Sequence, residues 1–219
     1  MALLFQNVDA MLFNPTVADE IAFGPRQLAL DEAAFRRRFR SEVALLFQNV
    51  DAMLFNPTVA DEIAFGPRQL GMDDVDARVA RWAAEWDVTG FLQRPPFELS
   101  GGEKKRVALA SILAIGPKVL LLDEATASLD PASSARLVDF LGGLEGVTIL
   151  VSTHNLTVAE ELAPRAILLG PGRSGVLHDG PTAALLQDDR LLVESGLAHR
   201  HAHRHGAEAH AHFHVHDTD

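Results

Sequence analysis

The chain has 219 residues, a hydrophobic content of 47% and a formal net charge of −11 at pH 7. This length is enough for a full α/β core, as one domain or as one domain with a small subdomain. The acidic balance disfavours nucleic acid as a partner. The absence of cysteine excludes disulfides and thiolate metal sites, which suits a reducing compartment.

The sequence contains neither a signal peptide pattern nor a membrane span. No basic region precedes an apolar run near Met1. The longest apolar stretch, residues 107–122, is interrupted by Gly116 and Pro117 and is too short to cross a bilayer. We therefore expect a soluble chain, and any role at a membrane would come through a partner.

Residues 2–28 and 44–70 have the same sequence, ALLFQNVDAMLFNPTVADEIAFGPRQL. Natural repeat arrays drift and need three or more units, so two identical copies indicate a recent duplication or an assembly or gene-model error. Each copy offers an apolar strand, then a glutamine (Gln6 or Gln48) and a proline-containing loop, and only one copy can take the native place. We expect the second copy there, because residues 35–43 lead naturally into its strand.

The rest of the chain alternates between helical and strand patterns. Trp82 and Trp86 have the spacing of an amphipathic helix and are expected in the core. Asp130 followed by Pro131 predicts a helix start with the aspartate as its N-cap. Alternating strands and helices predict an α/β fold with a largely parallel sheet. The expected helices are 72–86, 103 to about 115, 131 onward, 157–162 and 181–186, and the expected strands are 43–47, 119–122, 147–153, 166–169 and 176–177.

Two motifs carry the chemistry. In residues 99–106, LSGGEKKR, a Ser-Gly-Gly turn runs into a helix, so free backbone N–H groups and a helix N-terminus could receive a phosphate. In residues 119–124, VLLLDE, four apolar residues end in Asp123 and Glu124. A buried parallel strand has this pattern, and open α/β sheets bind ligands at that carboxyl end.

Together these motifs resemble the signature motif and Walker B strand of an ABC-type ATPase. Residues 54–67, LFNPTVADEIAFGP, narrow the resemblance to the ATPase subunits of energy-coupling-factor and cobalt or nickel uptake transporters. The resemblance covers about residues 40–190 and implies a P-loop NTPase-like fold with a helical signature subdomain at about 71–115. It also implies subunits that pair head to tail, sandwich two ATP molecules and drive a transmembrane partner at the cytoplasmic face of the cell membrane.

The resemblance implies a role for each matching residue. Asp123 would hold Mg²⁺, directly or through water, because this hard cation prefers carboxylate oxygen. Glu124 would polarise the attacking water, with His154 as the switch histidine that faces the γ-phosphate. Gln48 matches the Q-loop glutamine, which reaches Mg²⁺ and the water. The implied nucleotide-binding residues are Ser100, Gly101, Gly102, Glu103 and, in the D-loop, Asp130.

One part of the family pattern is missing from these residues. No GxxxxGK[ST] occurs, and Gly-Pro-Arg at 24–26 and 66–68 carries no Lys or Ser after it. The backbone of that loop cradles phosphates, its Lys neutralises them and its hydroxyl holds Mg²⁺. We therefore expect a duplicated segment at 1–28, an incomplete ABC ATPase domain at 29–195, and no productive ATP binding by this chain alone.

The C-terminal segment, 196–219, holds eight of the ten histidines. Such tracts are usually disordered, and the spacing in the sequence fits no rigid site. Neutral imidazole is a ligand for Ni²⁺, Co²⁺, Cu²⁺ and Zn²⁺. Two interpretations of the tail therefore remain: it captures metal ions as part of its function, or it binds them only incidentally. These histidines are His199, His201, His203, His205, His210, His212, His214 and His216.

Several hypotheses about function remain open. The first is an energising ATPase subunit of an importer for cobalt, nickel or another energy-coupling-factor substrate, in a homodimer or a heterodimer. The others are a catalytically silent partner that completes a neighbour's site, a non-functional truncated or rearranged fragment, and a metal-binding accessory protein that acts through the histidine tail. A DNA-repair or chromosome ATPase is disfavoured, because residues 55–67 suit a membrane partner.

Overall fold

The computed structural model describes residues 31, 38–127, 129–170, 175–205 and 208–215. Within them the strands form one three-stranded sheet, β1-β2-β3, and two two-stranded sheets, β4-β5 and β6-β7. The strands are β1 (Val43–Leu46), β2 (Val119–Asp123), β3 (Thr148–Ser152), β4 (Arg165–Leu169), β5 (Val176–Pro181), β6 (Ala198–His205) and β7 (Glu208–Val215). The helices are η2 (Val50–Ala52), α3 (Val59–Gln69), α4 (Val75–Glu85), η3 (Thr89–Phe91), η4 (Pro96–Glu98), α5 (Gly101–Leu113), α6 (Pro131–Gly142), α7 (Leu156–Leu162), α8 (Thr182–Leu186) and α9 (Asp189–Glu194).

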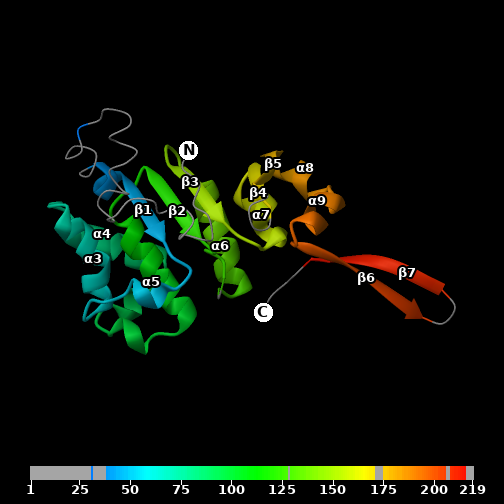
Figure 1. The fold of residues 1–219 in the computed structure, drawn as a ribbon. Helices are drawn as coiled ribbons and strands as arrows, with labels where there is room; N and C mark the ends of the chain where they lie inside the picture. Colours follow the sequence, from blue (N-terminus) through cyan, green and yellow to red (C-terminus); the bar gives the residue numbers. More distant parts are fainter. Residues whose placement is uncertain (1–30, 32–37, 128, 171–174, 206–207, 216–219) are drawn as a thin grey trace, which may run out of the picture.

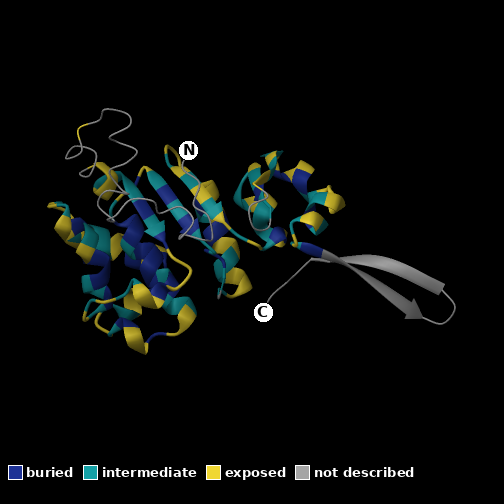
Figure 2. Ribbon diagram, in the orientation of Figure 1, coloured by how far each residue is buried: buried dark blue, intermediate teal, exposed yellow. Residues whose placement is uncertain are grey.

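The three-stranded sheet is parallel, which confirms the predicted α/β class. β2 lies in the middle, and Leu121 pairs with Leu45 of β1 on one side and with Leu150 of β3 on the other. Figure 1 shows α3, α4 and α5 gathered beside β1 and α6 beside β3. Buried residues are concentrated in α5 and in the middle of the sheet (Figure 2). This packing brings the carboxyl ends of β2 and β3 side by side.

The helix predictions on either side of the signature motif are confirmed. The helix expected at 72–86 is α4 (Val75–Glu85), and the helix expected from 103 to about 115 is α5 (Gly101–Leu113). Asp130 is the N-cap of α6, as expected. Trp82 and Trp86 are both buried, and each packs edge-on against the ring of Phe140. Their interpretation as core residues is correct.

The helix α3 occupies a segment for which the sequence analysis predicted no helix. Thr58 caps it by accepting a hydrogen bond from the Asp61 N–H at 3.1 Å, and the helix buries Val59 and Ile63 against the core. Gly66 is needed inside it, because a Cβ there would lie 2.7 Å from Ile115 Cγ1. Thr58, followed three residues later by the acid Asp61, was the overlooked signal of a helix start.

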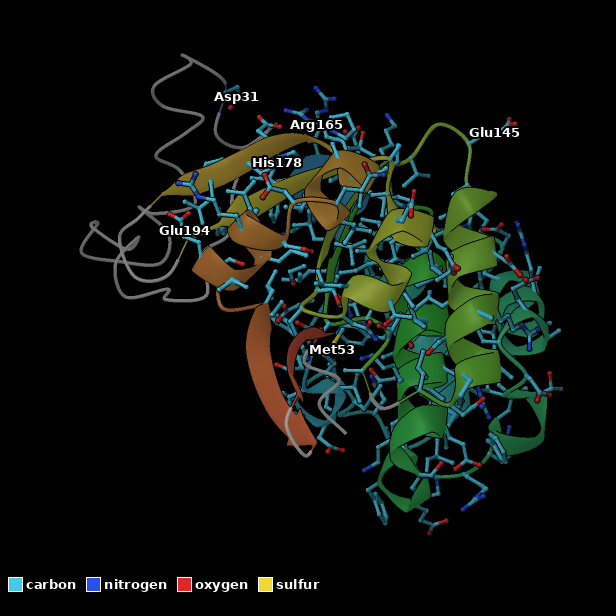
Figure 3. The ribbon with its side chains drawn as sticks, turned by 90° about the vertical axis from the view of Figure 1, so that its right-hand side faces the viewer. Asp31, Met53, Glu145, Arg165, His178 and Glu194 are labelled. Carbon is cyan, nitrogen blue, oxygen red and sulfur yellow. The ribbon has the colours of Figure 1, made fainter. Side chains whose placement is uncertain are left out.

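The second sheet, of β4 and β5, is antiparallel, so among the described strands the predicted, largely parallel pairing holds for β1, β2 and β3. The connection between β4 and β5 is too short for the crossover helix that a parallel pair requires, so the chain turns back on itself. An ion pair between Arg165 and Asp179, at 2.7 Å, joins the two strands. Figure 3 shows Arg165 and His178 on this sheet, which covers a separate small core of Leu156, Leu168, Leu185 and Leu192.

The C-terminal segment forms an antiparallel hairpin of β6 and β7, where we expected no regular structure. Histidine alternates there with alanine and arginine, and a period of two residues is the pattern of a strand. The hairpin extends away from the rest of the described chain (Figure 1). His216 and the residues after it lie outside the described part.

Of the two identical segments, the second, residues 44–70, lies within the residues that the structure describes. β1 belongs to the second copy and pairs in parallel with β2, as expected for residues 44–70. The first copy lies outside the described residues, and so does the prediction that 1–28 forms a separate segment. Over the residues that are described, no helix has both the length and the apolar character that a membrane crossing requires.

The pairing of β1 with β2 predicts that equivalent leucines in the two identical segments contribute unequally to stability. Leu46 is fully buried in β1, and Leu4 is its counterpart in the first copy. Leu46→Ala should lower the free energy of unfolding by about 2–5 kcal/mol, because a buried leucine leaves a cavity. Leu4→Ala is the matched control and should cost much less, as measured by chemical denaturation of both variants. Equal losses would contradict the assignment of the second copy to the sheet.

Candidate functional site

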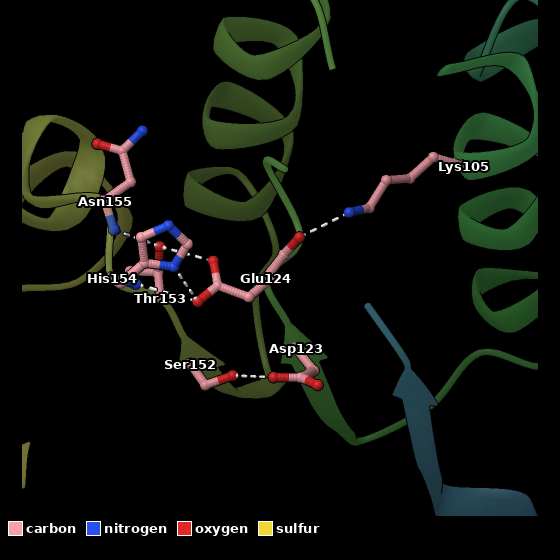
Figure 4. Close-up of polar contacts among 7 residues, drawn as sticks. All are labelled: Lys105, Asp123, Glu124, Ser152, Thr153, His154 and Asn155. Atoms are coloured by element: carbon pink, nitrogen blue, oxygen red, sulfur yellow. Dashed lines mark hydrogen bonds and ion pairs between the residues drawn. The ribbon is translucent and has the colours of Figure 1, made fainter. Parts of the chain in front are cut away.

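The site is built on the adjacent carboxyl ends of β2 and β3. Asp123 is the last residue of β2 and lies opposite Ser152, the last residue of β3. The Ser152 hydroxyl donates a hydrogen bond to Asp123 Oδ1, as Figure 4 shows. The Glu124 N–H continues the ladder by donating to the Ser152 carbonyl oxygen at 3.0 Å. Both carboxylates are therefore fixed at one edge of the sheet.

Glu124 and His154 form a close pair beyond these strand ends. Glu124 Oε1 accepts a hydrogen bond from the His154 N–H at 3.1 Å and lies 2.6 Å from His154 Nδ1 (Figure 4). The Glu124 side chain is 16% exposed, whereas that of His154 is 46% exposed. Glu124 has a φ of +48°, in the left-handed region that side chains rarely adopt. Strained residues of this kind gather at functional sites.

Lys105 joins the signature helix to this edge. Its Nζ donates hydrogen bonds to the carbonyl oxygens of Glu124, at 2.6 Å, and Ala127, at 2.9 Å. The residue is only 2% exposed, and burial lowers the pKa of its ammonium group, while the charges of Glu124 and Asp123 oppose that shift. The sequence analysis missed Lys105. Its position four residues before the buried Leu109, on the same side of α5, was the available signal.

The Ser-Gly-Gly turn is the N-terminus of α5. Ser100 is its N-cap, and Glu103 completes a capping box in which Glu103 Oε2 accepts from the Ser100 N–H and hydroxyl, both at 2.7 Å. These two hydrogen bonds lower the pKa of Glu103. Gly101 is exposed, and a Cβ there would meet no atom within 4 Å. The helix start is therefore open on the side where an anion could approach.

Gln48 follows β1, whose carboxyl end lies beside that of β2 because Leu46 pairs with Leu122. It is exposed and lines a shallow hollow together with Gly101, Lys105 and Ala127. An ion pair of 2.6 Å between Lys104 Nζ and Asp51 Oδ1 holds the segment after Gln48 against α5. The structure thus brings the Q-loop glutamine to the start of the signature helix. Glu124 and His154 do not line this hollow.

Asp130 has the structural role that its sequence predicts. Its carboxylate accepts hydrogen bonds from the Ser133 N–H, at 2.9 Å, and the Ser133 hydroxyl, at 2.6 Å. These bonds lower the pKa of Asp130. Its side chain therefore caps α6, and a contact with a second subunit stays a prediction.

The residues present fit Mg²⁺ bound together with a nucleotide, and they do not form an all-protein metal cage. Over the part of the chain whose side chains are described, no group of three or more His, Asp or Glu is arranged to hold a metal ion. Mg²⁺ bound to nucleotides usually takes one or two protein oxygens, with waters and phosphates as its other ligands. Asp123 supplies such a carboxylate at the edge of the sheet.

Comparisons with known proteins show which protein family the chain belongs to. A solved structure of cbiO1 from Clostridium perfringens, part of the ABC transporter complex cbiONQ, matches with a TM-score of 0.60 and 28% identity, over 73% of this chain and 65% of that one. A sequence profile of the ABC transporter family matches residues 11–127, just over half of the chain. The chain belongs to the ABC transporter family.

The names of individual relatives specify a type of transporter or its cargo. The chain is 42% identical to the cobalt import ATP-binding protein CbiO of Rhodobacter capsulatus, over 90% of this chain and 56% of that protein. It is 36% identical to the energy-coupling factor transporter ATP-binding protein EcfA of Methanothermobacter thermautotrophicus, over 90% of this chain and 50% of that protein. The chain therefore spans about half of the length of these curated relatives.

The matched range differs from the range of about 40–190 that the motifs suggested. The family profile begins inside the first copy, at residue 11, and ends at residue 127. Gln48, Ser100, Asp123 and Glu124 lie within it, whereas His154 lies beyond its end. The position of His154 next to Glu124 comes from the structure.

The buried bridge of Lys105 predicts a loss of stability. Lys105→Ala removes a buried ammonium group and leaves the Glu124 and Ala127 carbonyl oxygens without their donor, which should cost about 3 kcal/mol. Lys104→Ala is the matched neighbour and should cost less than about 1 kcal/mol, because its partner Asp51 is exposed. Denaturant unfolding of both variants measures this, and equal costs would contradict the role of the bridge.

The capping box predicts a dependence on pH. The folded-state pKa of Glu103 is lowered, so its ionised form adds stability above its ordinary pKa of 4.5 and loses that contribution as the pH falls through the lower value. Wild type should therefore exceed Glu103→Ala in unfolding free energy by a constant margin from pH 7 to pH 5, and the margin should shrink below pH 4.5. A margin that grows in acid would contradict this.

Proposed function

We propose that this chain is the ATP-binding, energising subunit of an ABC-type importer. The observation that carries the proposal is the arrangement of Asp123, Glu124 and His154 at two neighbouring strand ends, tied by Lys105 to the signature helix. The acidic groups at the strand ends would act on one nucleotide, and the backbone donors at the helix start would bind another, so two paired subunits would together supply what phosphoryl transfer requires.

In this proposal each residue has a distinct task. Asp123 holds Mg²⁺, which would neutralise charge on the phosphates when bound. Glu124 accepts a hydrogen bond from the attacking water and polarises it. His154 holds the Glu124 carboxylate in place through its backbone N–H and its ring, and that ring would face the γ-phosphate of a bound nucleotide. Gln48 is the link between this site and the membrane partner.

The phosphate-binding loop must come from outside these residues. The sequence has no GxxxxGK[ST], and ATP cannot be held productively without such a cradle. We propose that Ser100, Gly101 and Gly102 bind an ATP molecule carried on the phosphate loop of another ATPase subunit, with Glu103 orienting Ser100 and Asp130 at the boundary. The exposed, uncovered N-terminus of α5 supports this arrangement.

A membrane subunit is the proposed second partner, at the cytoplasmic face of the cell membrane. Phe55 is 66% exposed and Phe65 is 38% exposed, and their rings meet edge to face with centroids 4.9 Å apart. The buried carboxylate of Glu62 fixes this surface by accepting hydrogen bonds from the N–H groups of Phe55 and Asn56. An exposed aromatic pair of this kind suits an apolar partner helix.

The proposed cargo is cobalt, nickel or another energy-coupling-factor substrate. The names of the CbiO and EcfA relatives support it. The competing hypothesis is a catalytically silent partner or a non-functional fragment. A silent partner would complete a neighbour's site without needing Glu124, whereas an active subunit would need it.

The composite site gives the decisive test. The purified 219-residue chain should show no ATP hydrolysis, but mixed with an intact CbiO-type subunit it should support turnover that Ser100→Arg abolishes. Glu145→Arg adds the same side chain on an exposed loop and should leave turnover unchanged. A steady-state phosphate-release assay measures all four samples.

Each alternative has its own outcome in this assay. Hydrolysis by the chain alone would overturn the need for a second subunit. Turnover that survives Ser100→Arg would overturn the signature contribution. Turnover that survives Glu124→Gln would favour the silent partner.

A further inference from the structure

A small cavity lies where the end of α4, the first half of α5 and the first half of α6 come together. Its volume is about 160 Å³. The polar and aromatic side chains around it are Trp86, Asp87, Arg106, Ser133 and Arg136. None of the strand-end residues that hold the acidic pair and the histidine lines it. The cavity is therefore formed by a different set of groups from those assigned to phosphoryl transfer.

Two buried N–H donors of the cavity wall have no hydrogen-bond partner in the described part of the chain. They are the indole Nε1 of Trp86, a residue that is only 2% exposed, and Nε of Arg106. Most buried N–H groups in proteins are paired, because an unpaired one gives up its hydrogen bond to water and gains nothing in return. An acceptor bound in the cavity could give both donors a partner.

The cavity wall also carries two guanidinium groups. Among the described side chains, no carboxylate lies within ion-pair distance of Arg106 or Arg136. Arg136 donates a hydrogen bond to the Glu85 carbonyl oxygen. Since each guanidinium group has five N–H donors, both arginines retain donors for a ligand.

Most of the acids near these arginines already have partners. The charge of Arg106 acts on Glu103, whose carboxylate accepts hydrogen bonds from the Ser100 N–H and hydroxyl. The Asp130 carboxylate is used to cap α6. Asp87 is exposed, and among the described side chains it is the acid that lines the cavity. The wall therefore carries two positive charges against one negative charge.

Charge and size together define the class of ligand. Guanidinium groups form especially strong hydrogen bonds with phosphate and carboxylate oxygens, because both partners are charged. Sites for drug-sized molecules have volumes of about 300–1,000 Å³. This cavity is smaller, so it has room for a phosphate ion and not for a nucleotide.

We propose that this cavity binds a small oxyanion of the phosphate type, held by Arg106 and Arg136 and by the indole N–H of Trp86. A bound ion would connect α4, α5 and α6, and Arg136 already connects α6 with the end of α4 through the Glu85 carbonyl oxygen. The site uses neither the strand-end residues nor a phosphate loop. It therefore stands or falls separately from the proposed function.

The tryptophan in the wall provides a direct signal of binding. The chain has two tryptophans, and Trp82→Phe leaves Trp86 as the only one. Because Trp86 Nε1 is buried and unpaired, the indole must shift or gain a hydrogen bond when the ion binds, and its emission should change.

The first experiment is a titration of the full 219-residue Trp82→Phe chain with sodium phosphate, at pH 7.5 and constant ionic strength. Trp86 emission should change saturably, with a millimolar or tighter Kd. Sodium chloride should give no saturable change, and sodium acetate should bind about tenfold more weakly or worse, because a carboxylate offers fewer charged oxygens to two guanidinium groups. Calorimetric titration of the wild-type chain with phosphate should give the same Kd without any substitution.

Variants of the wall test the assignment of the ligands. Arg106→Gln and Arg136→Gln should each raise the phosphate Kd about tenfold or more, because each removes a charge-assisted hydrogen bond. Asp87→Asn should lower the Kd, since the carboxylate in the wall repels the ion. Arg38→Gln is the matched control and should leave the Kd unchanged, because Arg38 is exposed and pairs with Glu42 away from the cavity. Thermal melting checks that each variant is folded.

Four outcomes would count against the proposal. Absence of a saturable response to phosphate, in emission and in calorimetry, would overturn the site, and so would a response that chloride reproduces. A loss in Arg38→Gln equal to that in Arg106→Gln would show that net charge attracts the ion and the cavity does not. Acetate binding as tight as phosphate binding would overturn the assignment of a phosphate-type ligand. Weaker binding by Asp87→Asn would contradict the assigned wall.

Discussion

The candidate site depends on one buried cation. Lys105 is enclosed within the protein, and an ammonium group taken out of water is costly unless oxygen atoms replace its hydration. The Glu124 and Ala127 carbonyl oxygens do so, and they belong to the loop that follows β2. The signature helix and the acidic strand end are consequently held at a fixed separation. A change at one end of α5 has a direct physical route to the backbone of Glu124.

This link also explains why the functional residues form two groups. One group is the open start of α5. The other lies at the carboxyl ends of the parallel strands and consists of Asp123, Glu124 and His154, with Gln48 just beyond β1. In the proposed pairing of two subunits, the signature turn of one chain would serve a nucleotide bound by the other, whereas the strand-end residues would act on a different nucleotide. The proposed head-to-tail pairing thus agrees with the way that the single chain presents its polar groups.

The hairpin and the ATPase region follow different physical rules. The ATPase region depends on a shared apolar core in which strands, α3, α4 and α5 bury one another. β6 and β7 instead leave the body, and they contribute repeated polar positions in register. Their order depends on pairing between two strands, which is marginal in water without further support.

The sequence by itself determined the class of fold, the signature and acidic motifs, the cap at Asp130 and the buried tryptophans, because each depends on local propensity or periodicity. It assigned no helix to α3, which packs Val59 and Ile63 into the shared core. Only the tertiary structure decided the burial of Lys105, the contact of His154 with Glu124 and the antiparallel pairing of β4 and β5. The pairing of β6 with β7 also required it, because register across a turn is a relation between two strands that neither strand encodes alone.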